Sequence, residues 1–143
     1  MQHLKIICPN GHLGFAPLRP ESFEIGVNAL PDYIAADSGS DDVGPVPLGS
    51  DTSTSPEAWQ RGDLDKILLA SRRLGVPMVI GSAGDTGSNS RVDRYVAIIK
   101  ELAQQHGLKK FKLGYFYSEV DKETLRAKMR AGSAVLGLDG FAT

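Results

Sequence analysis

Four loops rich in Gly, Asp, Ser and Asn constrain this chain most, because each of them follows a short hydrophobic segment. They span residues 10–12, 37–42, 81–90 and 117–121. In an open parallel α/β sheet the carboxyl ends of the strands share one edge, so loops that are far apart in sequence converge there on one crevice. The pattern therefore predicts where a site lies better than it predicts which reaction occurs there.

The hydrophobic segments alternate with stretches of helical periodicity. Strands are predicted at 4–8, 33–36, 78–80 and 111–117, and helices at 20–29, 56–74, 90–106 and 122–130. The last strand rests on the alternation of Phe111, Leu113, Tyr115 and Tyr117 with other residues, and Cys8 is expected to be buried in the first strand. This order predicts right-handed βαβ crossovers and a three-layer Rossmann-like open parallel sheet with helices on both faces, or a part of a larger domain of that kind.

The composition bounds the classes of protein and partner. A chain of 143 residues is long enough for one α/β domain, expected here over 1–143, and too short for two comfortable ones. The formal net charge of -1 creates no strong field, which argues against nucleic acid and acidic membrane surfaces as partners. The single cysteine, Cys8, cannot form an internal disulfide, and no window holds ~18 consecutive apolar residues. We therefore expect a cytoplasmic protein without a membrane span.

The third loop carries three glycines between a strand and a helix. Gly81, Gly84 and Gly87 would let an anion approach the backbone and the free N–H groups of the following helix, and Asp85 and Thr86 add polar groups. The spacing G-x-x-G-x-x-G differs from the dinucleotide fingerprint, so NAD is disfavoured as a cofactor. The alternative is that these glycines only make a tight turn.

Acidic side chains and one histidine supply the candidate chemistry. Asp37, Asp41, Asp42 and Asp85 could together hold a divalent cation, although Asp also serves loops and caps without any ligand. His12 is the only histidine in a predicted strand-end loop, and its imidazole could move protons if an Asp from the next loop orients it.

The candidate residues follow from these loops. The predicted catalytic residues are His12, Asp37 and Asp85. The predicted ligand-binding residues are Asn10, Gly11, Ser38, Gly39, Ser40, Gly81, Ser82, Gly84, Thr86, Gly87, Asn89, Ser118 and Glu119. For Glu119 the simpler reading is a surface carboxylate before a helix. The polar stretch that continues to Ser55 is interpreted as an ordered functional loop, with disorder as the alternative.

Four strings of the sequence carry a family resemblance: 6–15 (IICPNGHLGF), 35–40 (AADSGS), 80–87 (IGSAGDTG) and 114–121 (GYFYSEVD). They resemble the N-terminal region of the acyclic terpene utilisation (AtuA-like) proteins, which are generally longer than this chain. The resemblance implies a bacterial catabolic protein for the degradation of branched acyclic terpenoids or related carboxylic acids. The reaction it implies is of the lyase or hydratase type, on a hydroxy acid or an acyl-CoA intermediate. It leaves the substrate and the reaction undefined.

Two functions of different classes remain open on the sequence. One is an enzyme module in which His12 and Asp37 handle protons while the 81–90 loop holds a carboxylate or phosphate. The other is a non-catalytic domain that binds a ligand or a companion subunit. Because a short sheet leaves unpaired edge strands, a homo-oligomer is expected in either case.

Overall fold

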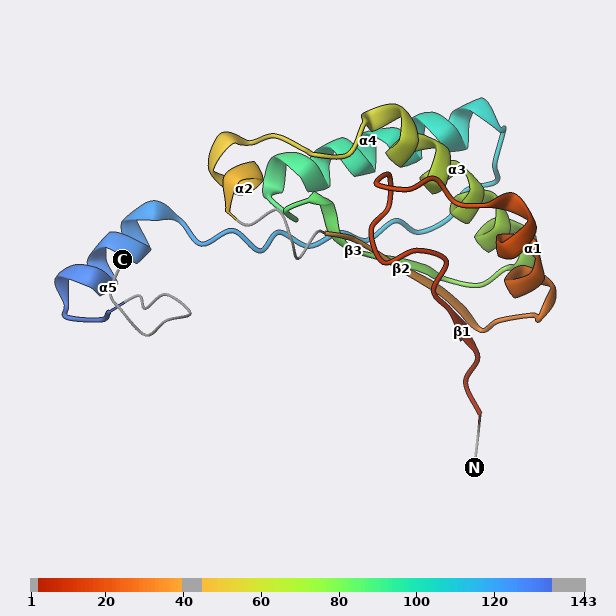
Figure 1. Ribbon diagram of the computed structural model, residues 1–143, viewed down its shortest axis with the longest axis horizontal. Coiled ribbons are helices and arrows are strands. Elements are labelled where there is room, and N and C mark those ends of the chain that lie inside the picture. The colour runs from red at the N-terminus through yellow and green to blue at the C-terminus, as the bar shows by residue number, and fades with distance from the viewer. Residues whose placement is uncertain (1–2, 40–44, 135–143) are drawn as a thin grey trace.

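The computed structural model describes residues 3–39 and 45–134 of the chain. Three parallel strands form one sheet in the order β1-β2-β3 (Figure 1). The elements are β1 (Ile6–Ile7), α1 (Pro20–Asn28), β2 (Tyr33–Gly39), α2 (Val46–Ser50), α3 (Glu57–Leu74), β3 (Met78–Asp85), α4 (Asn89–Gln105) and α5 (Lys122–Arg130). The α/β class and the open parallel sheet of Rossmann-like type are thereby confirmed.

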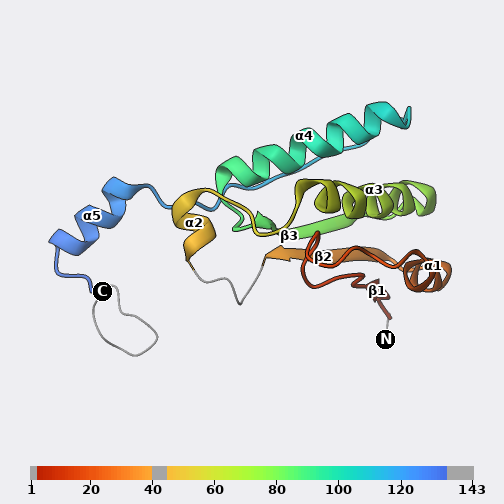
Figure 2. The same ribbon diagram turned by 45° about the horizontal axis from the view of Figure 1, so that its top comes forward.

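The three helices that pack on the sheet, α1, α3 and α4, lie on one of its faces, above the strands in Figure 1. Figure 2 shows α3 and α4 on the same side of β2 and β3. The burial of β2 agrees, since Ile34 and Ala36 are buried whereas Tyr33, which alternates with them, is 39% exposed. The strand order explains this arrangement. Right-handed crossovers place successive helices on the same side whenever the strands advance in one direction, and here the order never reverses. The described residues therefore form one helical layer instead of the expected two.

The core lies between that helical layer and the sheet. Leu64, Ile67 and Leu68 of α3 are at most 1% exposed, and Ile98 of α4 and Ile34 of β2 are fully buried. The spacing of these positions on α3 and α4 is the apolar stripe of a helix that packs on a sheet. Gly75 ends α3 in the left-handed conformation at φ 71°, as its place before Pro77 predicts. None of the helices that the structure describes is long and apolar enough to cross a membrane.

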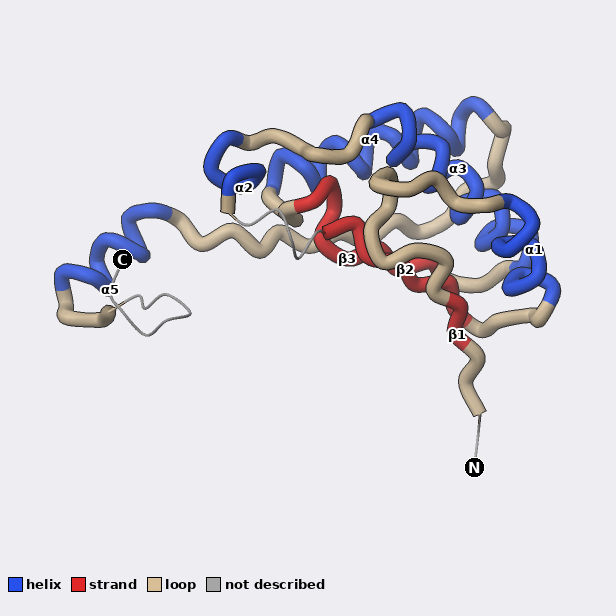
Figure 3. Tube along the Cα trace, in the orientation of Figure 1, coloured by secondary structure: helices blue, strands red, loops and turns tan. Residues whose placement is uncertain are grey.

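The predicted fourth strand at 111–117 is not one (Figure 3). The segment is extended, and Phe111 and Leu113 pack against the core, but it pairs with none of the described strands. Phe116 is 89% exposed. Alternation of side chains describes an extended backbone, whereas a strand also needs a neighbour to share its hydrogen bonds. Cys8, expected in the core, is exposed because β1 ends at Ile7.

The strands extend further into the predicted loops than the apolar runs indicate. β2 continues through Asp37 to Gly39, and β3 continues to Asp85. Register pairs Asp37 with Gly81 and Gly39 with Asp85, with an irregularity between the two pairs. The polar stretch after β2 contains the short helix α2, which ends at Asp51 in the left-handed conformation. These extensions carry the polar residues of β2 and β3 to the carboxyl edge of the sheet.

Candidate functional site

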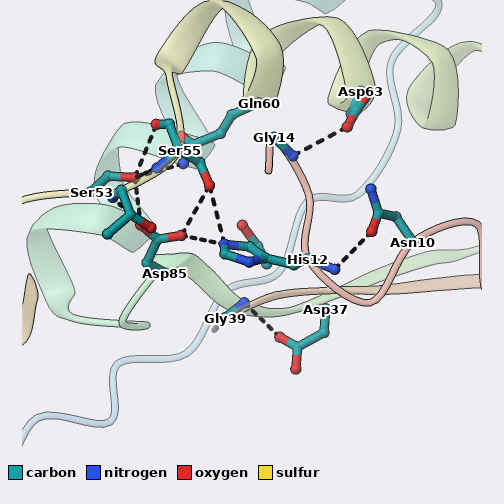
Figure 4. Close-up of polar contacts among 12 residues, drawn as sticks. Asn10, His12, Gly14, Asp37, Gly39, Ser53, Ser55, Gln60, Asp63 and Asp85 are labelled. Carbon is teal, nitrogen blue, oxygen red and sulfur yellow. Dashed lines mark hydrogen bonds and ion pairs between the residues drawn. The ribbon is translucent and has the colours of Figure 1, made fainter. Parts of the chain in front are cut away.

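Asp85 is the centre of the polar cluster at the carboxyl edge of the sheet. It is the last residue of β3, it is only 6% exposed, and its φ of 75° lies in the left-handed region. Gly84 before it also has a positive φ, of 61°. Two consecutive left-handed residues turn the chain sharply at the end of the strand. The Asp85 carboxylate points toward His12 and the 53–55 segment in Figure 4.

Hydrogen bonds reach both oxygens of this carboxylate. Oδ1 lies 2.7 Å from Nε2 of His12 and accepts a bond of 3.3 Å from Ser55 Oγ. Oδ2 accepts bonds from Ser53 Oγ at 2.8 Å, Thr54 Oγ1 at 3.0 Å and Thr54 N at 2.5 Å. Burial by itself raises the pKa of Asp85, but the bonds from His12, Ser53 and Thr54 outweigh it and lower the pKa to about 2. The carboxylate is therefore ionised at neutral pH.

This ionised partner decides the tautomer of His12. A carboxylate can only accept, so Nε2 of His12 carries the proton that it donates to Asp85. In the neutral imidazole Nδ1 is then the nitrogen without a proton, and it makes no hydrogen bond to any residue in 3–39 or 45–134. The side chain is 15% exposed, and the ring of Phe15 stacks on it with centroids 5.0 Å apart. An imidazole that is held in one orientation and has an unprotonated nitrogen can act as a general base.

The same geometry excludes a nucleophilic serine triad. Such a triad places the serine on one ring nitrogen and the acid on the other, so that the imidazole takes a proton from the hydroxyl. Here Ser55 Oγ lies 3.1 Å from Nε2 of His12, the nitrogen that already faces Asp85. Ser55 is also only 4% exposed. Its hydroxyl serves the Asp85 carboxylate instead of acting as a nucleophile.

The loop that carries His12 is held from both sides. Asn10 Oδ1 accepts from the backbone N of His12 at 2.9 Å, which makes an Asx turn. Asp63 of α3, which is fully buried, accepts from the backbone N of Gly14 at 3.1 Å and of Leu18 at 2.8 Å. Gly14 is required here because its φ is 83° and a Cβ would lie 2.4 Å from Cγ of Gln60. Hydrogen bonds from the backbone of the His12 loop to Asn10 and Asp63 thus fix the position of His12.

Asp37 is not part of this cluster. Its side chain belongs to the alternate set of β2 that faces away from the helices, is exposed, and accepts a bond of 2.9 Å from the backbone N of Gly39. Ser38, the next residue, is fully buried on the helical side and shares a hydrogen bond with the hydroxyl of Tyr95. Successive residues of a strand point to opposite faces, so Asp37 faces away from the helices whereas Ser38 faces them. The Asp37 carboxylate therefore does not converge with that of Asp85. Among the described residues no group of three or more His, Cys, Asp or Glu side chains could hold a metal ion.

The glycine loop makes a turn and leads into α4. Gly87 has a φ of 64°, and its backbone N donates to Ala83 O at 3.0 Å. The first backbone N of α4, that of Asn89, donates to Oε1 of Glu119 at 2.6 Å. The Glu119 carboxylate thus occupies the position at which a helix N-terminus binds an anion. Within 3–39 and 45–134 this is the one hydrogen bond of the Glu119 side chain.

The remaining predicted ligand-binding residues lie outside the Asp85 cluster. Thr86 Oγ1 accepts from the backbone N of Ser88, while Ser82, Thr86, Gly87 and Ser118 line a groove between β3, α4 and the 113–118 segment. Gly11 has open space at its Cβ position, Gly81 lies within β3 beside Asp37, and Ser40 with Asp41 and Asp42 lies outside the described residues.

Sequence reasoning missed the residues that complete the cluster. Ser53, Thr54 and Ser55 hold Asp85, Gln60 donates to Ser53 Oγ at 2.9 Å, and Asp63 holds the His12 loop. Pro56 occupies the N-cap position of α3, and no side chain caps this helix. The run Thr52-Ser53-Thr54-Ser55 of four hydroxyls before a proline was the available signal.

Comparison of the chain with family models, with curated proteins and with solved structures finds no match.

Proposed function

We propose that this chain is a catabolic enzyme module that moves a proton on a carboxylic acid or acyl-CoA intermediate, in a reaction of the lyase or hydratase type. The observation that carries the proposal is the pair formed by His12 and the ionised Asp85, which leaves Nδ1 of His12 without a partner among the described residues. Acidic hydrogens next to the carbonyl of an acyl group are the usual targets of such a base. The residues quoted above for the AtuA-like resemblance support the same class of substrate.

The roles follow from the chemistry of the pair. Nδ1 of His12 accepts the proton from the carbon beside the acyl group, and the imidazolium that forms is stabilised by Asp85, which stays ionised. In a dehydration the substrate hydroxyl leaves as water with a proton taken from the solvent, and His12 then releases the abstracted proton to the solvent, so that the net loss is one water. In the reverse direction His12 returns its proton to carbon. A positioned base of this kind contributes typically ~10²–10⁴-fold to a rate.

A second candidate is a non-catalytic domain that binds a ligand or assembles with a companion subunit. One observation favours it: both oxygens of Asp85 are fully used by protein donors from the 12–14 loop and the 53–55 segment. A carboxylate saturated in this way also serves simply to lock two loops together. The two candidates differ in whether Nδ1 of His12 exchanges protons with a ligand.

Proton exchange from candidate substrates into deuterated water tests the proposal directly. A panel of hydroxy acids, acyl-CoA thioesters and enoyl-CoA thioesters is incubated with the protein, and loss of the hydrogen beside the carbonyl is followed by NMR. We expect exchange or turnover with at least one class, lowered ~100-fold or more by His12→Asn. His106→Asn is the matched control, since His106 Nε2 also lies 2.7 Å from an aspartate, Asp65, but on the surface.

The outcome also separates the two candidates. Equal exchange by the parent and by His12→Asn, with unchanged melting temperatures, contradicts a catalytic His12. Saturable binding of a panel member without any exchange supports the binding domain instead. Asp85→Asn is expected to slow exchange while retaining ligand binding, because it removes the charge that stabilises the imidazolium.

A further inference from the structure

The outer edge of β3 borders a groove that lies between β3, α4 and the 113–118 segment. The extended segment 111–117 runs past β3 in the same direction, clear of it in Figure 2, and pairs with none of the described strands. A groove of about 510 Å³ lies between them. Its walls are largely apolar and include Met78, Ile80, Val96, Ile99 and Leu113. The outer N–H and C=O groups of β3 face it, because the inner ones pair with β2.

Backbone chemistry defines what fits this groove. An edge strand presents alternating donors and acceptors, and another extended backbone satisfies them in full. The 111–117 segment on the far side is extended as well, so a strand placed between the two would pair on both of its sides. Strands pair ~4.8 Å apart, so closure of the sheet by one inserted strand requires β3 and 111–117 to lie about 9.6 Å apart in the dimer.

We propose that the occupant is the 111–117 segment of a second copy of this chain. This segment is extended and largely apolar, and its backbone pairs with no strand in the part of the chain that the structure describes. In a two-fold dimer the segment of each copy enters the groove of the other, giving the order β3, partner 111–117, own 111–117, partner β3. One rotation fills both grooves with the same contacts, as an isologous interface requires. The two inserted segments run antiparallel to each other and to the β3 strand that each one joins.

The exposed aromatic side chains supply enough area for a stable dimer. Tyr115, Phe116 and Tyr117 are 51%, 89% and 52% exposed. Because a covered aromatic side chain buries ~150–250 Å², these three offer on the order of 400 Å² per copy. Two such segments, each against an equal area of groove, bury ~1,600 Å², the size of a standard specific interface. This inference concerns an edge of the sheet apart from His12 and stands independently of the proposed function.

Disulfide trapping tests the arrangement in the full chain. Position 114 lies at the centre of the segment, and no atom lies within 4 Å of a Cβ built on Gly114. In a Cys8→Ser background, Gly114→Cys and the neighbouring Leu113→Cys and Tyr115→Cys place single thiols near the two-fold axis. A disulfide needs Cα atoms ~4.4–6.8 Å apart, so we expect a covalent dimer at one or two of these three positions. Gly11→Cys, which also has open space at its Cβ, is the control that should stay monomeric.

Light scattering and hydrogen exchange complete the test. We expect the parent to have twice the chain mass, and Phe116→Asp to raise the dissociation constant by at least ~100-fold because it places a charge in the interface. Since Phe116 is exposed within one copy, this variant should keep its fold, as checked by circular dichroism. The β3 amides should be protected in the dimer and exchange faster in the variant. A monomeric parent from 1 µM to 1 mM overturns the proposal, as does a dimer that Phe116→Asp leaves intact or a monomer whose β3 amides are protected.

Discussion

Replacing Asp85 by Asn should destabilise the fold strongly, although the two side chains have nearly the same size. The pKa of Asp85 falls from 3.8 to about 2 in the folded chain, and one pKa unit is ~1.4 kcal/mol, so ionisation stabilises the fold by roughly 2 kcal/mol at neutral pH. Asn also presents an NH₂ group to donors such as Thr54 N and His12 Nε2. One buried donor then loses its acceptor, at a cost of ~1–3 kcal/mol.

The expected total is a loss of about 3 kcal/mol, or a fall of roughly 10 °C in the melting temperature for a chain of this length. Urea unfolding followed by circular dichroism measures the free energy directly. Asp65→Asn is the matched control, because Asp65 Oδ1 lies 2.7 Å from His106 Nε2, with both side chains about 30% exposed. That exposed pair should contribute at most ~1 kcal/mol.

The pH dependence gives the same prediction a second readout. The folded pKa of Asp85 is lower than its unfolded pKa, so the stabilisation is complete above about pH 5 and is lost as the pH falls toward 2. The difference between the parent and Asp85→Asn should therefore be constant near neutral pH and shrink below pH 4. Equal losses for Asp85→Asn and Asp65→Asn, or a difference that does not depend on pH, would refute the assignment of Asp85 as the ionised centre of the cluster.

Three further substitutions test the frame around the cluster. Gly84→Ala should lower the free energy of unfolding in urea by ~1–2 kcal/mol, because φ of Gly84 is 61° and the new Cβ would lie 3.1 Å from Arg91. Gly11→Ala is the control, and it should cost less than ~0.5 kcal/mol because the space around Gly11 is open. Asp63→Ala should cost ~3 kcal/mol because it leaves two backbone N–H groups of the His12 loop unpaired, and a retained melting temperature would argue against that anchor. Tyr95→Phe should cost ~1 kcal/mol in thermal unfolding, because it leaves the buried Ser38 hydroxyl without its partner; no change would mean that water replaces the bond.

Local patterns were sufficient to predict most of the elements. α3, β3 and α4 follow from apolar periodicity and from turn residues such as Gly75. Asp121 caps α5 by accepting a bond of 2.8 Å from Thr124 N, which is a common role for Asp before a helix. His12 and Asp85 could be named in advance because each lies just after an apolar segment that forms a strand. These signals are contained within a few residues, so a single sequence is enough to read them.

Only the tertiary structure decides which strands pair and on which face of the sheet the helices and side chains lie. The sequence does not contain the strand order, which places α1, α3 and α4 on one face. Among the described strands none pairs with 111–117. The sequence does not show that Asp37 lies on the face of β2 away from the helices while the Asp85 carboxylate binds the 53–55 segment. The role of Ser53, Thr54 and Ser55 depends on a contact with Asp85 across 30 to 32 residues. Loop residues of this kind have no periodicity, and a long-range hydrogen bond leaves no local signal, so only the folded chain determines which donors meet which acceptor.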